Sequence, residues 1–443
     1  SSDYLSFTPS STSNQKTWTV SCWVKRSALT STMYIWGVNG DTSGHYFSEL
    51  NFNSGDQLEF IQGGTVGDPY QTQMLTNARY RDPSAWLNIV VAVDTTQSTE
   101  SNRFKMFVNG EQITDWAISN YPSQNENFRW HFVGSEGYPH SIGRTGKRNS
   151  NYFDGYICEW IDIDGTQLDA TSFGEFDSDS PTIWKPKDIS GLTLGTNGAY
   201  LDFEDSSSLG NSVGNSNNYT ANNLTSIDQS TDTCTNNFAT LNSIALNNNT
   251  SQNHISLSEG NLKASGTSAS NNGNGFSTIG FNSGKWYCEV KIIDVQGATF
   301  PIVGVITEEN INRISGASGS IGYSTTDTVG YAPDGDKIIN DGQSSYGNSF
   351  TDNDIIGIAI DCDNGAVYFS KNGTFQNSGD PTSGASKTNA AMTFTPSKNY
   401  FFGCSPYTST SVVEFNFGSP PYSESGGNSD GNGYGNFAAS VPV

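Results

Sequence analysis

Hydrophobic and polar residues alternate in short runs along most of this chain. From Thr17 onward, Trp18, Val20, Cys22 and Val24 share one face of the chain, and the residues between them share the other. A period of two predicts a half-buried β-strand. In the same half of the chain, further strands are predicted at 33–38, 57–61, 87–93, 103–108 and 152–163. Short strands separated by polar turns, without a convincing amphipathic helix among them, favour an antiparallel sandwich.

The second half of the chain shows a comparable pattern. Strands are predicted at 255–257, 285–292, 302–306, 329–332, 355–360, 366–370, 400–403 and 412–417. One local plan occurs in both halves: an aliphatic strand ending in Asp, a turn, then a strand ending in Asn-Gly, at Asp94 with Asn109-Gly110 and at Asp361 with Asn372-Gly373. Asn-Gly between extended segments predicts a hairpin, because a type I′ turn needs positive φ at both central residues. Two sandwiches of one general design are therefore predicted, which favours recognition over catalysis.

Composition divides the chain into four parts: a sandwich at 1–180, a connector at 181–254, a second sandwich at 255–420 and a tail at 421–443. The connector is rich in Asn, Ser and Thr and has too few apolar residues to cover a core of its own. We expect it to lie along its neighbours with short strands such as 199–203; an unstructured linker is the alternative. The Gly- and Asn-rich tail is interpreted as a tail or linker toward something outside this chain.

Charge narrows the range of partners. Only 15% of the 443 residues are charged, against about 25% in ordinary soluble domains. The net charge is −23, and such a surface repels phosphate backbones, so neither nucleic acid nor an anionic membrane is an expected partner. Solubility alone is the simpler explanation of this charge. The chain has no run of 18 apolar residues, so membrane insertion is not predicted. The six cysteines form no C-x-x-C pair and are expected to be buried thiols, not zinc ligands.

Several short motifs carry a family resemblance. In the first half, the residues at 86–91, 107–110, 141–144 and 153–159 are together similar to a laminin G-like or concanavalin A-like lectin domain. In the second half, the residues at 284–290, 330–335, 361–373 and 413–418 resemble a SPRY domain. The resemblance implies an all-β fold of two concanavalin A-like jelly-roll β-sandwiches joined by an Asn/Ser/Thr-rich connector.

The order of these two domains, joined at Trp184-Lys185-Pro186-Lys187 and followed by the Gly/Asn-rich residues 425–437, resembles virion proteins of tailed phages of marine bacteria. This resemblance implies a noncatalytic virion structural or adhesion protein at the surface of the particle, a fibre or a capsid or tail appendage. Its partners would be host cell-surface glycan or protein and other virion proteins, and it would form a homo-oligomer, for which a trimer is common in such virions. Two alternatives stay open: a purely structural module that decorates or cements the capsid, and a glycan depolymerase.

The depolymerase alternative requires paired carboxylates. Jelly-roll β-glucanases place them on one strand face as Glu-x-Asp-x-(x)-Glu, about 5–5.5 Å apart in a retaining enzyme. Here the segment that starts at Glu175 has no second glutamate, and the segment that starts at Glu159 has the wrong spacing. The four histidines, His45, His131, His140 and His254, lie in no recognisable Ser/His/Asp or Cys/His motif. The sequence therefore predicts no catalytic residue.

Residues 120–140 form the candidate ligand site. This segment is long, polar and rich in aromatic residues. Exposed rings beside amide and guanidinium groups suit sugar binding, because a ring stacks on apolar C–H groups while polar groups bond hydroxyls. The residues predicted to bind ligand are Tyr121, Asn125, Arg129, Trp130, His131, Tyr138 and His140. The alternative is that Phe128, Trp130 and Phe132 alternate into a core as an ordinary strand.

Calcium is weighed at Asp361-Cys362-Asp363-Asn364-Gly365, which imitates the start of an oxygen-ligand loop. Asn372 stands where an EF-hand needs its distal glutamate, so the hairpin is the preferred interpretation of these residues. Laminin G-like relatives sometimes hold calcium at the sandwich rim, to which Asp94 or Asp154 could contribute, but neither has an identifiable set of partners. No metal or cofactor is predicted, and calcium stays an open alternative.

Overall fold

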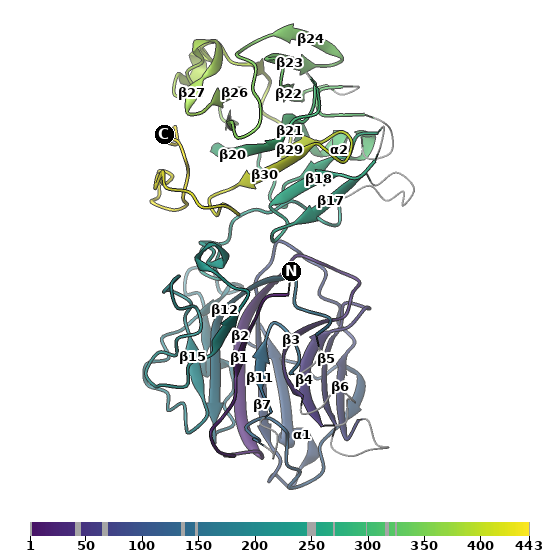
Figure 1. Ribbon diagram of the computed structural model, residues 1–443, viewed down its shortest axis with the longest axis vertical. Helices are drawn as coiled ribbons and strands as arrows, with labels where there is room; N and C mark the ends of the chain where they lie inside the picture. The colour runs from purple at the N-terminus through teal and green to yellow at the C-terminus, as the bar shows by residue number, and fades with distance from the viewer. Residues whose placement is uncertain are drawn as a thin grey trace. The chain divides into compact units, whose positions relative to one another are not determined.

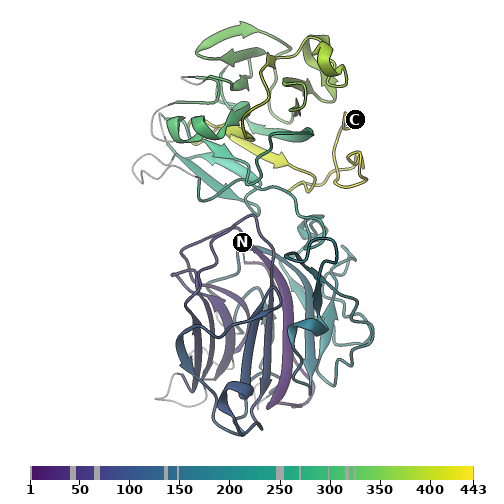
Figure 2. The same ribbon diagram turned by 180° about the vertical axis from the view of Figure 1, so that it is seen from behind.

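The computed structural model describes residues 2–39, 46–63, 70–133, 138–146, 149–245, 254–268, 271–297, 299–314, 319–323 and 326–442. These residues form antiparallel β-sheets with a few short helices, which confirms the predicted all-β class (Figure 1). The chain divides into two compact units, seen from opposite sides in Figures 1 and 2. One unit holds residues 1–229 and 233–237; the other holds 230–232 and 238–443. Among the described residues, no helix is long and apolar enough to span a membrane.

Two sheets build the first unit. The eight-stranded sheet contains, in spatial order, β10 (Trp116–Asn120), β6 (Thr72–Thr76), β5 (Leu58–Gly63), β4 (Phe47–Phe52), β3 (Met33–Asn39), β11 (His140–Ile142), β1 (Tyr4–Phe7) and β16 (Thr220–Asn222). The six-stranded sheet contains β15 (Ala199–Leu201), β12 (Gly155–Asp164), β2 (Thr17–Arg26), β7 (Leu87–Asp94), β8 (Phe104–Val108) and β9 (Glu111–Gln112). Helix α1 (Glu100–Arg103) fills the polar gap between β7 and β8.

Strand β2 is buried on both of its faces. Trp18, Val20, Cys22 and Val24 face the core between the sheets, as their alternation predicts. The opposite face is buried too, because residues 168–194 cover it, and Trp23 packs there in a second apolar cluster with Trp184. The six-stranded sheet is therefore sandwiched between two apolar layers.

Trp184 anchors that covering segment. It belongs to strand β14 (Trp184–Pro186), which pairs with β13 (Gly174–Phe176), and its indole Nε1 donates a hydrogen bond to Asn88 Oδ1 at 3.1 Å. A Cβ atom added at Gly110 or Gly174 would lie 2.5 Å from the Trp184 ring. Glycine at these two positions lets the indole lie flat on the backbone.

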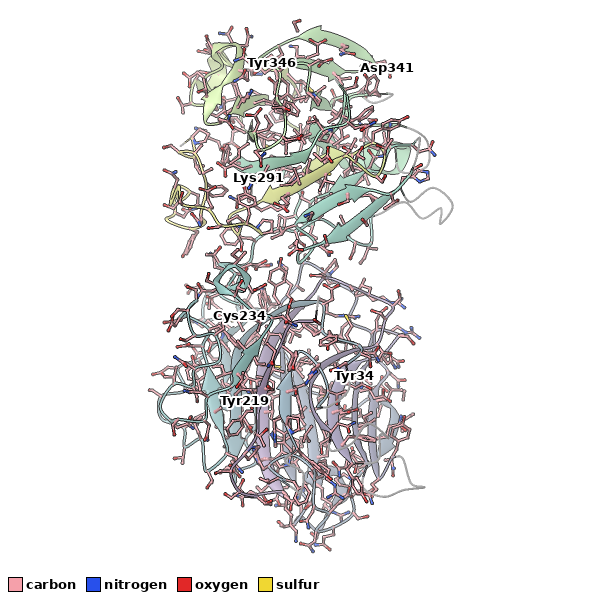
Figure 3. The ribbon with its side chains drawn as sticks, viewed as in Figure 1. Tyr34, Tyr219, Cys234, Lys291, Asp341 and Tyr346 are labelled. Carbon is pink, nitrogen blue, oxygen red and sulfur yellow. The ribbon has the colours of Figure 1, made fainter. Side chains whose placement is uncertain are left out.

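The residues expected to form a connector, 181–254, are divided between the two units. Within the first unit, β15 pairs with β12 and β16 pairs with β1, so this segment extends both sheets. Residues 233–237 return to the first unit, where Lys25 Nζ donates to Asn237 Oδ1 at 2.7 Å. The amide of Cys234, labelled in Figure 3, donates to Cys158 Sγ at 3.4 Å. Residues 246–253 lie outside the described residues.

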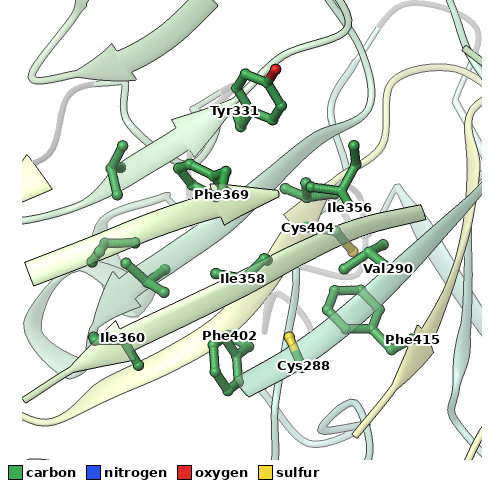
Figure 4. Packing of buried hydrophobic residues seen from close by; sticks show 14 of the residues in the cluster. Cys288, Val290, Tyr331, Ile356, Ile358, Ile360, Phe369, Phe402, Cys404 and Phe415 are labelled. Atoms are coloured by element: carbon green, nitrogen blue, oxygen red, sulfur yellow. The ribbon is translucent and has the colours of Figure 1, made fainter. Parts of the chain in front are cut away.

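The second unit also has two sheets. One contains β17 (Ile255–Ser258), β18 (Lys263–Gly266), β30 (Val412–Asn416), β20 (Lys285–Asp294), β25 (Ile355–Asp361), β26 (Ala366–Lys371) and β27 (Thr374–Phe375), and β28 (Met392–Thr393) also pairs with β26. The other contains β19 (Gly275–Phe276), β29 (Tyr400–Ser405), β21 (Ile302–Thr307), β22 (Val329–Tyr331), β23 (Asp336–Ile339) and β24 (Gly342–Ser345); helix α2 (Glu308–Ile314) follows β21. Side chains such as Cys288, Ile358 and Phe402 form the core between them (Figure 4).

The two predicted Asn-Gly hairpins share one hydrogen-bonding device. Asn109 and Asn372 have φ of 48° and 49°, and each is followed by a glycine with positive φ, as the type I′ turn requires. Asn109 Oδ1 accepts from the amide of Asn88 at 2.8 Å, and Asn372 Oδ1 accepts from the amide of Ile355 at 2.8 Å. In each unit the turn asparagine therefore bonds to the start of the strand that pairs with its own, β7 in the first unit and β25 in the second.

The C-terminal residues differ from the predicted linker, because they dock on the second unit. Glu289 of β20 is fully buried, and its carboxylate accepts from the amides of Ala438 and Ala439 at 2.9 Å each. Asn416 Nδ2 and the Tyr287 hydroxyl donate to the same carboxylate at 3.1 and 3.2 Å. At the start of the tail, the Tyr422 ring lies 4.5 Å from Nζ of Lys291, which Figure 3 labels.

A buried ion pair closes one end of the first unit. Arg26 Nη2 donates to Asp56 Oδ1 at 3.0 Å, and the two side chains are 1% and 0% exposed. Burial alone opposes ionisation of Asp56, but the Thr30 amide, Arg81 and Arg26 together hold the pKa of this carboxyl below its usual range. Arg26 also stacks on the Phe52 ring, 4.2 Å from its centroid.

We expect Asp56→Asn to destabilise the first unit by about 3–5 kcal/mol, because it leaves the Arg26 charge buried without its partner. Because the folded pKa of Asp56 is lowered, its contribution to stability is present above its unfolded pKa and is lost as the pH falls through the folded value. Urea unfolding between neutral and acid pH measures both effects. The exposed Asp82→Asn is the control, and equal stability of the two variants at neutral pH would contradict the prediction.

We expect Glu289→Ala to release the C-terminal tail and to lower the unfolding free energy of the second unit by at least about 2 kcal/mol, because it leaves several buried donors without an acceptor. Hydrogen exchange of the Ala438 and Ala439 amides, followed with the denaturant midpoint, tests this. Glu424→Ala changes a half-buried carboxylate of the same tail, which accepts from the nearby Gly426 amide and has no contact with Glu289, and should leave both readouts unchanged. Unaltered hydrogen exchange at Ala438 in Glu289→Ala would show that the hydrogen bonds to Glu289 are not what holds the tail.

Candidate functional site

The candidate segment runs from the end of β10 at Asn120 to the start of β11 at His140. Its described residues, 120–133 and 138–140, form turns and irregular chain and no strand before His140. The segment begins and ends in the eight-stranded sheet and contacts the six-stranded sheet on the way: the Asn125 amide donates to Thr95 O just past the end of β7, and the His131 amide donates to His140 Nε2 at 2.8 Å. Positive φ at Asn125 and His131 allows the sharp bends of this path.

Three of the predicted ligand residues lie in the interior. Trp130 and His131 are 0% exposed and His140 is 1% exposed. The Trp130 ring lies 4.7 Å from the Trp36 ring and 4.4 Å from the His140 ring, and its Nε1 donates to Asp162 Oδ1 at 3.2 Å. The expectation that these three side chains reach a ligand at the surface is therefore wrong, because the core between the sheets takes up their rings. Phe128 is buried there as well, so the core alternative describes Phe128 and Trp130 although no strand forms.

His131 is the centre of a buried charge network. Its Nε2 lies 3.1 Å from both carboxylate oxygens of Asp162, and its Nδ1 lies 3.2 Å from Asn14 O and 3.4 Å from Asp164 Oδ1. Both ring nitrogens thus face oxygen acceptors, which is the arrangement of a doubly protonated imidazolium. Burial opposes the charge, but Asp162 and Asp164 raise the pKa of His131 above its usual value.

His140 stays neutral beside this cation. Its Nε2 accepts the His131 amide, so that nitrogen carries no proton. Burial and the neighbouring His131 charge hold the pKa of His140 well below its usual value. Asp164 accepts further hydrogen bonds from the amides of Asn14 and Asn197, which help keep it ionised. This network joins the candidate segment to the last residues of β12 and has a structural role.

Another part of the segment is open to solvent. The Arg129 guanidinium lies 4.8 Å from the Tyr46 ring and 5.2 Å from the Phe132 ring, and Phe132 contacts Tyr138 edge to face at 5.5 Å. We call Tyr46, Arg129, Phe132 and Tyr138 the Arg129 cluster; all four are half-buried. The amide of Arg129 donates to Ser48 Oγ at 3.0 Å, which fixes the base of the cluster on β4.

Strand register explains why these residues meet. Asn39 pairs with Phe47 and Val38 pairs with His140, so β4 and β11 both begin at the end of the sheet where β3 finishes. Tyr46 and Tyr138, which precede those two strands, therefore lie at one edge of the sandwich. Sequence reasoning chose Arg129 and Tyr138, weighed Phe132 only as a core residue, and missed Tyr46. Only the pairing of β3 with β4 brings Tyr46 to the segment.

Tyr121 and Asn125, the other two predicted ligand residues, do not belong to the Arg129 cluster, because their contacts are with other segments of the chain. Tyr121 packs partly buried against the core, next to Pro122, whose carbonyl accepts from Arg103 Nη1 at 3.1 Å. Asn125 is exposed, and its amide donates to Thr95 O just past the end of β7. Ligand binding by these two residues stays a prediction.

The residues weighed for calcium act as turn formers. Asp361 Oδ1 accepts from the Asn364 amide at 2.9 Å, and Asp361 Oδ2 accepts from Asn364 Nδ2 at 2.8 Å, which confirms the preferred hairpin. Asp94 accepts in the same way from the Thr96 amide. Within the described part of the chain, no group of three or more His, Cys, Asp or Glu side chains could hold a metal ion.

The two glutamates considered for hydrolysis have separate partners. Glu159 of β12 accepts from the Tyr200 hydroxyl at 2.7 Å, and burial raises its pKa. Glu175 of β13 lies 3.6 Å from Lys185 Nζ across the β13–β14 pair and is half exposed. Each carboxylate thus has its own local structural role, on a different sheet.

Comparison with known proteins supports two binding domains. Residues 1–160 match the family model of the concanavalin A-like lectin/glucanases superfamily, in its laminin G form, and residues 285–420 match the SPRY domain. These matches confirm the predicted order of a laminin G-like and a SPRY domain. Domains of both kinds are β-sandwiches that generally bind glycans or proteins and are generally noncatalytic.

Two solved structures are similar to part of this chain. The SPRY domain of human HERC1 is 18% identical, with 36% of this chain and 91% of that chain covered and a TM-score of 0.29. A second human SPRY domain is 18% identical, with 39% of this chain and 98% of that chain covered and a TM-score of 0.27. Among curated proteins, no match to this sequence was found.

We expect His131→Ala to destabilise the first unit by about 3–5 kcal/mol, because it leaves Asp162 buried without its counter-charge. The folded pKa of His131 is raised, so its stabilisation is fully present below the unfolded value of about 6.5 and is lost as the pH rises through the folded value. Urea unfolding from pH 6 to pH 10 should show this loss in the parent protein and a flatter profile in the variant. His254→Ala, in the second unit, serves as control; a profile in His131→Ala as steep as that of the parent would contradict the assignment.

Proposed function

We propose that this chain is a noncatalytic virion protein of a tailed phage of marine bacteria, a fibre or a capsid or tail appendage, that binds host-surface glycan or protein. The observation that carries the binding role is the Arg129 cluster on a lectin-like domain. The virion setting rests on the resemblance in domain order and in the Gly/Asn-rich residues 425–437. In that setting the protein sits at the particle surface in contact with other virion proteins, as a homo-oligomer, with a trimer as the form implied by analogy.

The Arg129 cluster has the properties of a shallow sugar site. Phe132 and Tyr138 are packed against each other, and Arg129 stacks on Phe132 and Tyr46, so the rings are held in place before a ligand arrives. A preorganised aromatic surface loses little conformational entropy on binding. Phenol and guanidinium groups beside these rings supply hydrogen-bonding partners for hydroxyls, as an amphipathic sugar requires.

Catalysis is not part of the proposal. A retaining glycosidase needs two carboxylates about 5–5.5 Å apart, free to act on one sugar. Glu159 is engaged by Tyr200, Glu175 lies beside Lys185, and Asp162 and Asp164 are partners of His131. These contacts support binding as the role of the first unit and weigh against a depolymerase.

We expect Tyr138→Ala and Phe132→Ala each to weaken glycan binding about tenfold, which corresponds to about 1.4 kcal/mol for one aromatic contact. Binding is measured with the purified chain on an array of bacterial surface polysaccharides and on intact marine bacteria. The melting temperature of each variant is recorded alongside, because both side chains also contact each other.

Phe176→Ala provides the matched control, since Phe176 is a 43% exposed aromatic residue of the same unit outside the cluster. It should leave binding unchanged. Absence of binding by the parent chain to both the array and the cells would remove the basis for adhesion and leave a purely structural role in the capsid. Equal weakening by Phe176→Ala would show that the Arg129 cluster is not the site.

A further inference from the structure

Trp286, at the start of β20, is the one exposed tryptophan among the nine of this chain, all of which lie in the described residues. Its side chain is 43% exposed, whereas seven of the other eight are at most 8% exposed and Trp116 is half-buried. Farther along β20, Cys288 and Val290 on the same strand face enter the core. Trp286 therefore lies where that face passes from the core to solvent.

The indole is held in a fixed orientation. Its Nε1 donates to Ser283 O at 2.8 Å, and its ring stacks on Phe281 with a centroid distance of 5.3 Å and an interplanar angle of 15°. Phe281 is itself 5% exposed, packs on Phe402 at 4.9 Å and exchanges backbone hydrogen bonds with Tyr400. Since Phe281 covers one face of the indole, the exposed area belongs to the opposite face and the edges. An isolated exposed aromatic is common, but one fixed by both a hydrogen bond and a parallel stack is a rigid flat surface.

Polar residues flank Trp286 in the turn that leads into β20. Asn282 and Ser283 of this turn are exposed, and so is Asp363. Asp363 Oδ1 accepts from the Gly284 amide at 2.7 Å, which brings its carboxylate to the turn that carries Trp286. An aromatic anchor at a protein–protein interface fills an apolar pocket of the partner, whereas a sugar ring needs a flat apolar face with hydrogen-bonding partners for its hydroxyls nearby. The polar surroundings of Trp286 fit the sugar.

We propose that Trp286 is a stacking platform for a carbohydrate ring, with the Asp363 carboxylate as a hydrogen-bonding partner for the sugar hydroxyls. The platform lies in the second unit, so it is independent of the Arg129 cluster and of the proposed function of the first unit. Its ligand class is a hexose or N-acetylhexosamine residue of a polysaccharide, whose axial C–H groups can lie on the indole. The second unit then contributes a sugar contact of its own.

The test follows the indole N–H signal of Trp286 by NMR in the full chain, identified by its loss in Trp286→Phe. The probes are cellohexaose, laminarihexaose, mannohexaose and chitohexaose. We expect at least one of them to shift this signal, Trp286→Ala to weaken its binding at least tenfold, and Trp286→Phe to retain part of the affinity. Tyr434→Ala, which changes another exposed aromatic of the second unit, should bind like the parent chain.

No shift of the Trp286 signal with any of the four probes overturns the proposal, and so does equal binding by Trp286→Ala and the parent chain. The retained melting temperature of Trp286→Phe guards against an effect of misfolding. Tyr138→Ala is titrated in parallel, so that failure of the site in the first unit is told apart from failure of the Trp286 platform. Attachment to cells that depends on Trp286 but survives periodate oxidation of the cell-surface glycans overturns the sugar assignment in favour of a protein partner.

Discussion

A charge removed from water must find its counter-charge or its hydrogen-bond donors inside the protein, and this requirement organises both units. Asp162 is satisfied by His131, Asp56 by Arg26, and Glu289 by the amides of Ala438 and Ala439. Each partner comes from a distant part of the sequence. Because an unpaired buried charge is costly, each of these contacts fixes a segment whose composition alone suggests a loop or a linker.

The same requirement separates structure from function in the candidate segment. His131 has to turn inward to neutralise Asp162, and Trp130 and His140 follow it into the core. The neighbouring residues Arg129 and Phe132 are then left at the rim, where they meet Tyr46. The buried network thus positions the Arg129 cluster: the contacts of His131 with Asp162 fix the backbone between Arg129 and Phe132.

Local patterns in the sequence predict the strands and the two Asn-Gly hairpins, because alternation and turn chemistry act over a few residues. They do not predict that Trp184 covers the outer face of β2 or that Ala438 and Ala439 dock on Glu289, since both contacts depend on packing between distant segments. At Phe128 and Trp130 the alternation in the sequence is compatible with a strand and with an aromatic loop. The hydrogen bond that holds Trp130 in the core goes to Asp162 on a distant strand, so the local pattern does not predict it. Tyr46 carries no signal in the sequence, because strand pairing alone places it beside Arg129.

The docking of the tail on Glu289 also has a mechanical consequence. A pulling force applied at the C-terminal end acts first on the hydrogen bonds from Ala438 and Ala439 and on the bond from Asn416 Nδ2 to Asn436 O. Strand β30, paired with β18 on one side and β20 on the other, comes under load only after these bonds break. Breaking the hydrogen bonds to Glu289 would therefore free tail residues before the strands of the second unit separate.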